Sequence, residues 1–201
     1  KKKVVYNFRQ KDLKYGGQGA PLTPIFHKLL VNQFKIYQPV VILNIGGISN
    51  ITHIENNKIK ESKDIGPGNC LIDQWIRENS KKKFDLNGSI AAKGKVNHLI
   101  CLEAVTEWYT KFTLWFREEY SERIGWKRKK KSRTFDIGDF DLTFIRSLSS
   151  EKYTNLEDGA ANLTSYTARI ISMEINAMRS RVVICGGGRK NNFLIELIEK
   201  K

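Results

Sequence analysis

The sequence predicts an α/β protein, because strands, glycine-rich turns and helices follow one another in it twice. The first such unit extends from Val40 to Ile76 and the second from Val182 to Ile198. In both, β-branched runs lead through a turn with two or more glycines into a helix with one apolar face. The 201 residues are 40% apolar and 28% charged, which is typical of a globular chain and not of a disordered one.

The first unit contains three predicted strands. Val40 to Leu43 and Ile48 to Ile54 are apolar runs on either side of Gly46-Gly47, which makes a tight turn between them. Asn56-Asn57 forms the next turn, and Lys58 to Lys63 is a short return strand. We therefore expect two consecutive hairpins before the first buried helix.

The end of the third strand carries the first candidate for chemistry. Asp64 stands there, just before Gly66-Pro67-Gly68-Asn69, and the helix that follows has an apolar face made of Leu71, Ile72, Trp75 and Ile76. Backbone N–H groups at such a junction point at an anion. A carboxylate beside it acts as a general base or holds Mg²⁺. An ordinary glycine-rich connection with a solvated Asp64 fits the same spacing, so both interpretations stay open at this level.

The N-terminal stretch is predicted to contain a short strand, a glycine-rich loop and a short helix. Val4 to Phe8 is the strand, and the loop covers Gly16 to Leu22. Three glycines and Pro21 specify an irregular loop that brings the backbone close to another group, although a turn that only packs is the alternative. Pro24 to Val31 is the helix, and we expect it to bury Ile25, Leu29 and Leu30.

The C-terminal half is predicted to be mainly helical. Val96 to Gly125 forms one or two amphipathic helices, and Asn155 to Met178 forms a long helix with Asn155 as its N-cap. A buried strand, Val182 to Cys185, and a helix, Phe193 to Ile198, follow it. The long helix is expected to bury Leu163, Tyr166, Thr167, Ile170, Ile171 and Ile175.

Gly186-Gly187-Gly188 lies between the last strand and the last helix, in the arrangement with which proteins approach a nucleotide or phosphate. A triple glycine alone is a weak signal. The chain contains neither G-x-x-x-x-G-K-[ST] nor G-x-G-x-x-G, which excludes a P-loop NTPase and disfavours a Rossmann dehydrogenase.

Three motifs in one order, GGQGAPLTPIFH, NIGGISNIT and DIGPGNCLIDQWI, resemble the anhydro-N-acetylmuramic acid kinases, sugar kinases of the actin/hexokinase-like ATPase superfamily. The resemblance is strong over Val5 to Val96, moderate over Phe135 to Leu194 and poor between Cys101 and Lys130. It implies a partial actin-like (ribonuclease H-like) ATPase fold with mixed sheets flanked by helices. It also divides the chain into a sugar and phosphate region (1–100), a divergent helical and basic segment (101–134) and a truncated nucleotide-side region (135–201).

The resemblance implies an ATP-dependent kinase that uses Mg²⁺ and converts 1,6-anhydro-N-acetylmuramic acid to N-acetylmuramic acid 6-phosphate during cell-wall recycling. Asp64 would activate the water that opens the sugar ring. Arg9 would pair with an anionic sugar substituent, and the amide of Gln18 would bind hydroxyls or an acetamido group. The other implied substrate-side residues are Gly19, His27 and Asn69. The implied nucleotide-side residues are Gly46, Gly47, Asn50, Gly66, Gly68, Gly186, Gly187 and Gly188. No residue is assigned as a metal ligand.

For two of these assignments, His27 and Arg9, the residues themselves leave another interpretation open. His27 has no partner at ligand or triad spacing, and a lone histidine on such a helix is more often structural or solvated than catalytic. The family usually has Asp before the Phe-Arg pair, whereas this chain has Asn7, which removes a charge beside Arg9.

The Gly-Thr-Ser-x-Asp-Gly loop with which these kinases begin and hold ATP phosphate does not occur in the sequence. Because grip on the phosphates is a major part of kinase catalysis, we expect this chain alone to have little or no kinase activity. A missing N-terminal fragment and a second copy of the chain are then expected partners, besides the sugar and ATP. A non-catalytic remnant that still binds sugar is the alternative.

The net charge of +14 raises a third hypothesis, a basic module that binds nucleic acid. No recognition-helix or RNA-binding motif surrounds the lysine runs, so we favour compositional bias as their cause. Three widely spaced cysteines indicate a reducing compartment and no zinc site. With no signal peptide and no apolar run of membrane length, we expect a cytoplasmic protein without a membrane partner.

Overall fold

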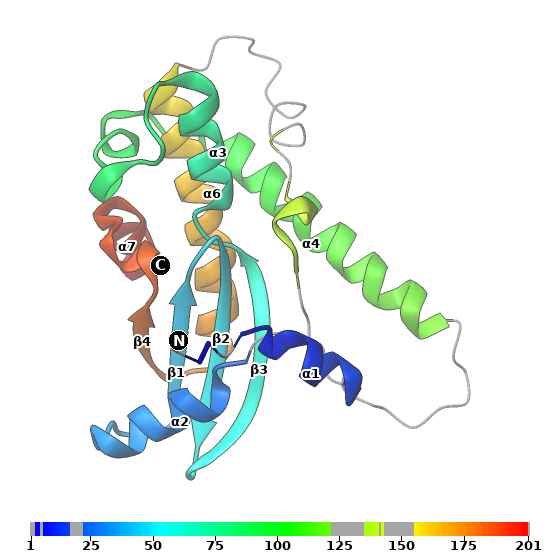
Figure 1. Ribbon diagram of the computed structural model, residues 1–201. Coiled ribbons are helices and arrows are strands. Elements are labelled where there is room, and N and C mark those ends of the chain that lie inside the picture. The colour runs from blue at the N-terminus through cyan, green and yellow to red at the C-terminus, as the bar shows by residue number, and fades with distance from the viewer. Residues whose placement is uncertain are drawn as a thin grey trace.

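Four strands form one mixed sheet in the part of the chain that the computed structural model describes, residues 3–4, 6–16, 22–121, 135–140, 142 and 155–200. Strands β1 (Val40–Ile45), β2 (Ile48–Glu55) and β3 (Lys58–Pro67) pair antiparallel in succession. Strand β4 (Arg181–Cys185) pairs with β1 in parallel, which gives the order β3-β2-β1-β4 (Figure 1). The mixed α/β class expected from the sequence is confirmed.

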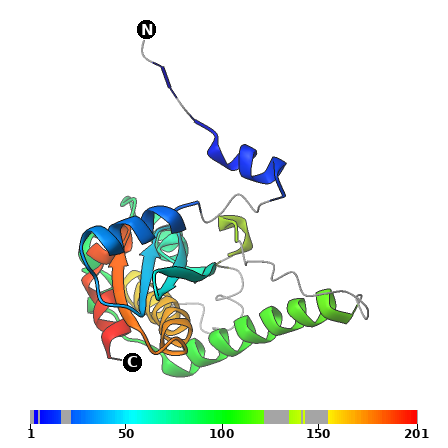
Figure 2. The ribbon, with the colours of Figure 1, turned by 90° about the horizontal axis from the view of Figure 1, so that it is seen from below.

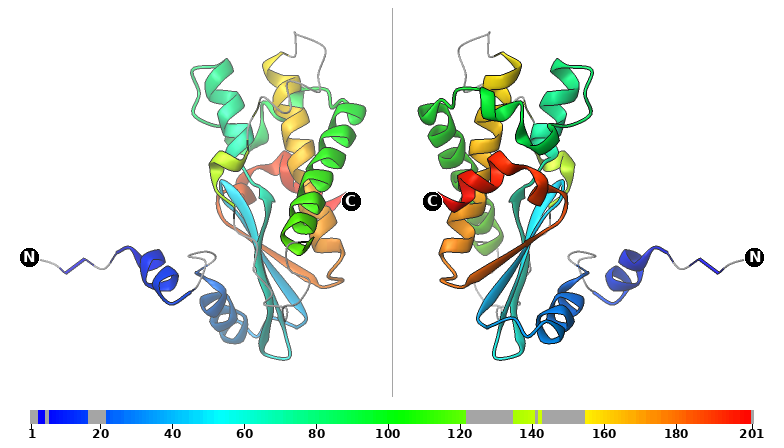
Figure 3. Two further views of the ribbon diagram at one scale, coloured as in Figure 1. Left: turned by 90° about the vertical axis from the view of Figure 1, so that its right-hand side faces the viewer. Right: turned by 90° about the vertical axis from the view of Figure 1, so that its left-hand side faces the viewer.

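Helices α6 (Leu156–Asn176) and α2 (Pro24–Gln33) lie on opposite sides of this sheet (Figure 3), and side chains alternate between its two faces. One face packs on α6 through Val41, Leu43, Ile45, Ile51 and Ile65. The other face packs on α2 and the turn after it through Val40, Ile42 and Ile54. The apolar runs of β1 and β2 therefore come from burial on both sides.

A second core lies above the sheet, where α3 (Cys70–Asn79) and α4 (His98–Ser121) pack against the N-terminal half of α6. Trp75 of α3 fixes one of these contacts, because its indole N–H donates to the carbonyl of Leu156 at 2.9 Å. The segment 135–140 closes this core with Phe135 and Phe140, whose ring centroids lie 5.5 Å apart and each 5.4 Å from Trp108.

The two C-terminal helices begin at asparagine caps. Asn155 accepts a hydrogen bond from the N–H of Asp158, as its predicted N-cap role requires. Asn191 does the same for Leu194 at the start of α7 (Asn192–Glu199). All six residues of the stripe predicted on the long helix are buried. Short 3-10 turns, η1 (Leu86–Gly88), η2 (Ala91–Lys93), η3 (Ile137–Asp139) and η4 (Gly187–Lys190), complete the described elements.

The structure corrects the prediction at the N-terminus. No strand forms at the described residues between Val4 and Phe8, because none of the described strands pairs with them. The segment instead enters helix α1 (Phe8–Lys14). Helix α2 is present, but Ile25 and Leu29 are exposed, while His27 and Val31 face the sheet.

Two strands differ from their predicted form. Strand β3 continues to Pro67, so that Asp64 lies within the strand and not at its end. The last residues of β3 include a polar residue and a glycine, so the sequence does not indicate a strand there. Pairing with β2 stabilises this part of β3. Strand β4 lies at the sheet edge and is half-buried where a buried strand was expected.

Candidate functional site

Three glycine-containing segments meet at one end of the sheet. Strands β1, β3 and β4 run in the same direction, so the turns that follow them lie at the same edge. A Cβ on Gly68 would lie 2.3 Å from the carbonyl oxygen of Gly46, and one on Gly188 would lie 3.1 Å from Nδ2 of Asn69. The carboxyl edge of parallel strands is where α/β proteins bind their ligands. The structure therefore brings six of the predicted nucleotide-side and substrate-side residues into one cluster: Gly46, Gly47, Gly68, Asn69, Gly186 and Gly188.

The N–H groups at the start of α3 are used inside the protein. Those of Gly68 and Cys70 donate to the carbonyl of Gly47 at 2.8 and 3.1 Å, and that of Asn69 donates to Gly46 at 2.8 Å. The side chain of Asn69 donates to the same Gly46 carbonyl at 3.1 Å. This corrects the expectation that these backbone groups point at an anion. The turn at Gly46-Gly47 caps the helix instead, and Asn69 ties the two segments together.

The triple glycine divides into two packing positions and one open position. Gly186 has φ +82°, and a Cβ there would lie 2.5 Å from Oδ1 of Asn44. A Cβ on Gly188 would overlap Cγ2 of Ile45 at 2.2 Å. A Cβ on Gly187 would meet no atom of the described residues within 4 Å. The residues present therefore fit the close approach of a nucleotide at Gly187, because its backbone borders open space.

A row of polar side chains crosses the α2-facing side of the sheet next to this glycine cluster. Asn50 of β2 pairs with Asn44 of β1 and with Asp64 of β3, and Asn44 pairs with Cys185 of β4. Directly paired residues of a ladder point to the same face, so the row forms one polar strip. A bulge follows Asp64, because the ladder skips Ile65, and both Ile65 and Gly66 lie on the α6-facing side.

Asp64 is buried, with 4% of its surface exposed. Its carboxylate accepts a hydrogen bond from the backbone N–H of Phe135 at 2.8 Å. This N–H belongs to the segment whose aromatic side chains, Phe135 and Phe140, pack with Trp108. A buried carboxylate held by a backbone donor at the ligand-binding edge can accept a proton from a substrate or a water.

Asn50 has an amide oxygen that is buried and bonds to no group among the described residues. Buried acceptors without partners are rare in proteins, and an asparagine in the same row as Asp64 is therefore suited to contact a ligand. The sequence-based assignment of Asn50 to the site gains support from this position.

His27 faces the sheet from helix α2. Its Nδ1 lies 2.8 Å from the hydroxyl of Thr52, and only 6% of the residue is exposed. Burial lowers the pKa of His27, so the imidazole is neutral at neutral pH. Thr52 lies two residues after Asn50 on the same face of β2, which places His27 beside the polar row.

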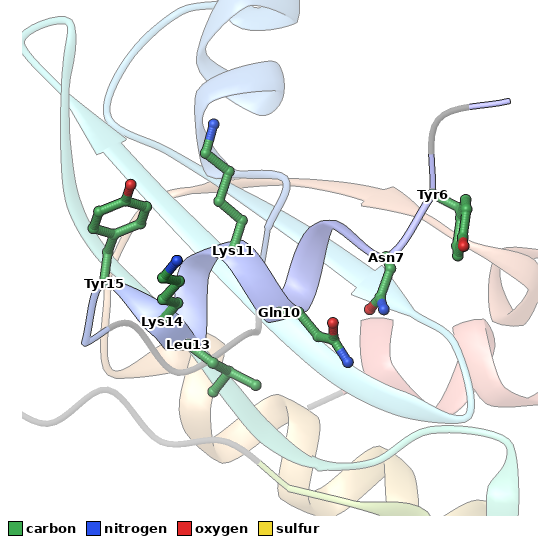
Figure 4. Close-up of a pocket in the computed structure, with 7 residues that line it drawn as sticks. All are labelled: Tyr6, Asn7, Gln10, Lys11, Leu13, Lys14 and Tyr15. Carbon is green, nitrogen blue, oxygen red and sulfur yellow. The ribbon is translucent and has the colours of Figure 1, made fainter. Parts of the chain in front are cut away.

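The remaining predicted substrate residues are not brought to the site by the structure. Gln18 and Gly19 lie outside the described residues. Arg9 is exposed on α1, which stands apart from the sheet in Figure 2. A hollow of about 750 Å³ borders α1, but its side chains point to different sides of the helix and none belongs to the glycine cluster (Figure 4). This hollow is lined by Tyr6, Asn7, Gln10, Lys11, Leu13, Lys14 and Tyr15.

Sequence reasoning missed four residues that shape the site: Asn44, Thr52, Ser62 and Phe135. Asn44 is the single polar residue in the run Val40–Ile45, and that position was the available signal. Phe135 donates its backbone N–H to Asp64, which lies 71 positions earlier in the sequence, and no sequence pattern predicts such a contact.

Comparison with known proteins shows the family to which the chain belongs. A family model described as anhydro-N-acetylmuramic acid kinase matches residues 1–201. The chain belongs to the anhydro-N-acetylmuramic acid kinase family. With this membership, its mixed sheet flanked by helices is part of the actin-like fold expected from the sequence.

Several curated members of the anhydro-N-acetylmuramic acid kinase family are similar to the chain. One from Pelagibacter ubique is 42% identical over 100% of this chain and 50% of its own length. Others from Methylobacterium nodulans and Haemophilus influenzae are 34% and 33% identical and are covered over 47% and 49% of their lengths. The chain thus spans about half the length of the curated relatives it matches. Among its described residues, no helix is long and apolar enough to cross a membrane.

Proposed function

We propose that this chain forms part of an ATP-dependent kinase that converts 1,6-anhydro-N-acetylmuramic acid to N-acetylmuramic acid 6-phosphate. The observation that carries the proposal is the position of Asp64: a buried carboxylate beside the glycine cluster at the carboxyl edge of the sheet. Family membership supplies the substrate class. We further propose that 1–100 is the sugar and phosphate region, that 101–134 is a divergent helical and basic segment, and that 135–201 is the nucleotide-side region.

Asp64 is the proposed general base. It accepts a proton from a water whose oxygen attacks the anomeric carbon, and the bond from that carbon to O6 of the sugar breaks. O6 then takes the γ-phosphoryl group, and ADP leaves. The backbone N–H of Phe135 keeps the carboxylate in place, and the neighbouring aromatic rings exclude bulk water.

ATP supplies the phosphoryl group, and Mg²⁺ neutralises its charge. Gly187 is the position at which the backbone approaches the nucleotide, while Gly186 and Gly188 hold the turn against β1. Gly46, Gly47, Gly66 and Gly68 shape the phosphate side, and Asn69 joins this turn to α3. Arg9, Gln18, Gly19 and His27 are proposed for the sugar side.

We expect low activity from this chain by itself, because it lacks the Gly-Thr-Ser-x-Asp-Gly phosphate loop of the family. Its proposed partners are a fragment that carries this loop and a second copy of the chain. A cytoplasmic location stays a prediction. ATP-dependent turnover by the purified chain alone would contradict the expected dependence on a partner.

The experiment that tests the function is co-expression with a polypeptide that carries the phosphate loop, followed by an assay of sugar phosphorylation. Asp64→Asn keeps an acceptor for the N–H of Phe135 but removes the base, so kcat should fall by about 10²- to 10⁴-fold.

Asp85→Asn is the matched control. Asp85 is also buried and accepts two backbone N–H groups, those of Ile90 at 2.8 Å and Ala91 at 2.9 Å, but it lies outside the site. Its replacement removes one of these two bonds and should lower stability, while kcat per folded molecule should stay unchanged. Equal losses in the two variants would refute the role of Asp64, and sugar binding without turnover would favour a non-catalytic fragment.

A further inference from the structure

The side chains of Ser62, Thr52 and His27 form a hydrogen-bonded relay that connects β3, β2 and α2. The hydroxyl of Ser62 donates to the carbonyl of Ile51 at 3.2 Å. Oγ of Ser62 lies 3.5 Å from Oγ1 of Thr52, which in turn lies 2.8 Å from Nδ1 of His27. Thr52 is fully buried and His27 nearly so, so water does not compete for these groups.

The number of protons on each hydroxyl limits which group can donate at each step of this relay. A serine or threonine hydroxyl has one proton to donate and two lone pairs to accept with. Ser62 gives its proton to the carbonyl of Ile51, so towards Thr52 it acts only as an acceptor. If Thr52 donates to Ser62, its own oxygen accepts from Nδ1–H of His27. This order uses the free lone pair of Ser62 as well as that of Thr52, and it is the order that connects all three side chains.

We infer that this relay holds His27 in the tautomer protonated at Nδ1 and presents its Nε2 lone pair as an acceptor for a sugar hydroxyl or acetamido N–H. A hydrogen bond at one ring nitrogen of a neutral histidine sets the chemistry of the other. Nε2 forms no bond to any described residue, and it is not among the enclosed nitrogen and oxygen atoms without a partner.

The place of His27 in the fold agrees with a sugar-side acceptor. Thr52 pairs with Ser62, and the next pair on the same face is Asn50 with Asp64. Two residues along a strand span roughly 7 Å, which is the scale of one sugar ring. A bare nitrogen repels phosphate oxygens and attracts O–H and N–H donors, so it favours a sugar hydroxyl or acetamido N–H over a phosphate group. This ligand assignment rests on the proposed function, whereas the tautomer does not.

The tautomer is measured on the chain itself by ¹⁵N-edited NMR of histidine-labelled protein at neutral pH. We expect protonated Nδ1 and bare Nε2 at His27. Thr52→Val removes the hydroxyl at nearly constant volume and should allow the Nε2-protonated form to appear. Thr52→Ser keeps the hydroxyl and should restore the wild-type spectrum. Protonation at Nε2 in the wild-type chain overturns the inference.

The ligand role is tested by titration with 1,6-anhydro-N-acetylmuramic acid. In His27→Asn the amide N–H₂ takes the place of Nδ1–H and preserves the bond to Thr52, but no acceptor replaces Nε2. We expect its affinity for the sugar to fall at least about tenfold, which equals about 1.4 kcal/mol, while its unfolding midpoint stays near the wild-type value.

Each outcome of the titration separates the two claims. Sugar binding that moves other resonances but leaves Nε2 unchanged, with full affinity in His27→Asn, overturns the ligand role. If the chain together with the polypeptide that carries the phosphate loop binds no sugar, the proposed function fails and the ligand role falls with it. The spectrum alone still decides the tautomer.

Discussion

Gly187 and Gly188 are neighbours in the sequence but have opposite surroundings. The Cα of Gly188 faces Ile45 so closely that an added Cβ would lie 2.2 Å from its Cγ2 atom, whereas the Cα of Gly187 faces open space. Gly188 is therefore required by the packing of the turn on β1. Nothing within the described residues requires glycine at 187, which is why we place the nucleotide there.

Alanine at each of these positions gives a residue-scale prediction. Gly188→Ala should lower the free energy of unfolding by about 1–3 kcal/mol, because the methyl group overpacks a buried contact. Gly187→Ala should change it by less than about 0.5 kcal/mol. Urea unfolding of both variants measures the difference. A loss at Gly187 as large as that at Gly188 would contradict the packing argument.

The candidate site shows which residues a sequence can indicate. The glycine turns and Asp64 stand out locally, because glycines beside strand ends and a carboxylate before them form a recognisable pattern. The row of Asn44, Asn50 and Asp64 depends on the register of three strands, which sequence spacing does not specify. The bulge at Ile65 adds an irregularity that no alternation pattern contains.

At the scale of elements, two helices begin at asparagine caps that differ in burial. Asn155 is exposed, and its Oδ1 accepts from the N–H of Asp158 at 2.7 Å. Asn191 is buried, with 6% of its surface exposed, and accepts from the N–H of Leu194 at 3.0 Å. Water can replace a lost cap at Asn155 but not at Asn191.

Asn191→Ala should therefore destabilise the protein more than Asn155→Ala. We expect about 0.5–1 kcal/mol for the exposed cap and about 1–3 kcal/mol for the buried one, because the latter leaves a buried N–H without a partner. The change in urea midpoint measures both. Serine at either position should recover part of the loss, since its hydroxyl also accepts from the helix start. Equal losses at the two caps would show that burial does not decide their strength.

Elements with strong local signals were predicted correctly, and those set by tertiary contacts were not. The long helix has a cap at Asn155 and a continuous apolar stripe, so its local sequence determines it. Helix α2 has apolar residues on two sides, and the bond from His27 to Thr52 selects the side that faces the sheet. Periodicity alone does not predict that the helix face with His27 is buried while the face with Ile25 and Leu29 is exposed.

At the scale of the whole molecule, helix α2 turns His27 towards the sheet and leaves an apolar surface exposed to solvent. Ile25, Phe26 and Leu29 are 71%, 58% and 59% exposed on consecutive turns of the helix. Contiguous apolar surface of this kind is typical of protein contacts and of association in solution.

The apolar surface predicts association that rises with concentration. Ile25→Gln with Leu29→Gln should lower the weight-average mass measured by light scattering at high concentration. The free energy of unfolding should stay within about 0.5 kcal/mol, because neither side chain belongs to the core. Leu99→Gln is the control, since Leu99 is 73% exposed on α4, on the other side of the sheet. If Leu99→Gln reduces association as strongly, the effect comes from general hydrophobicity and not from the α2 surface.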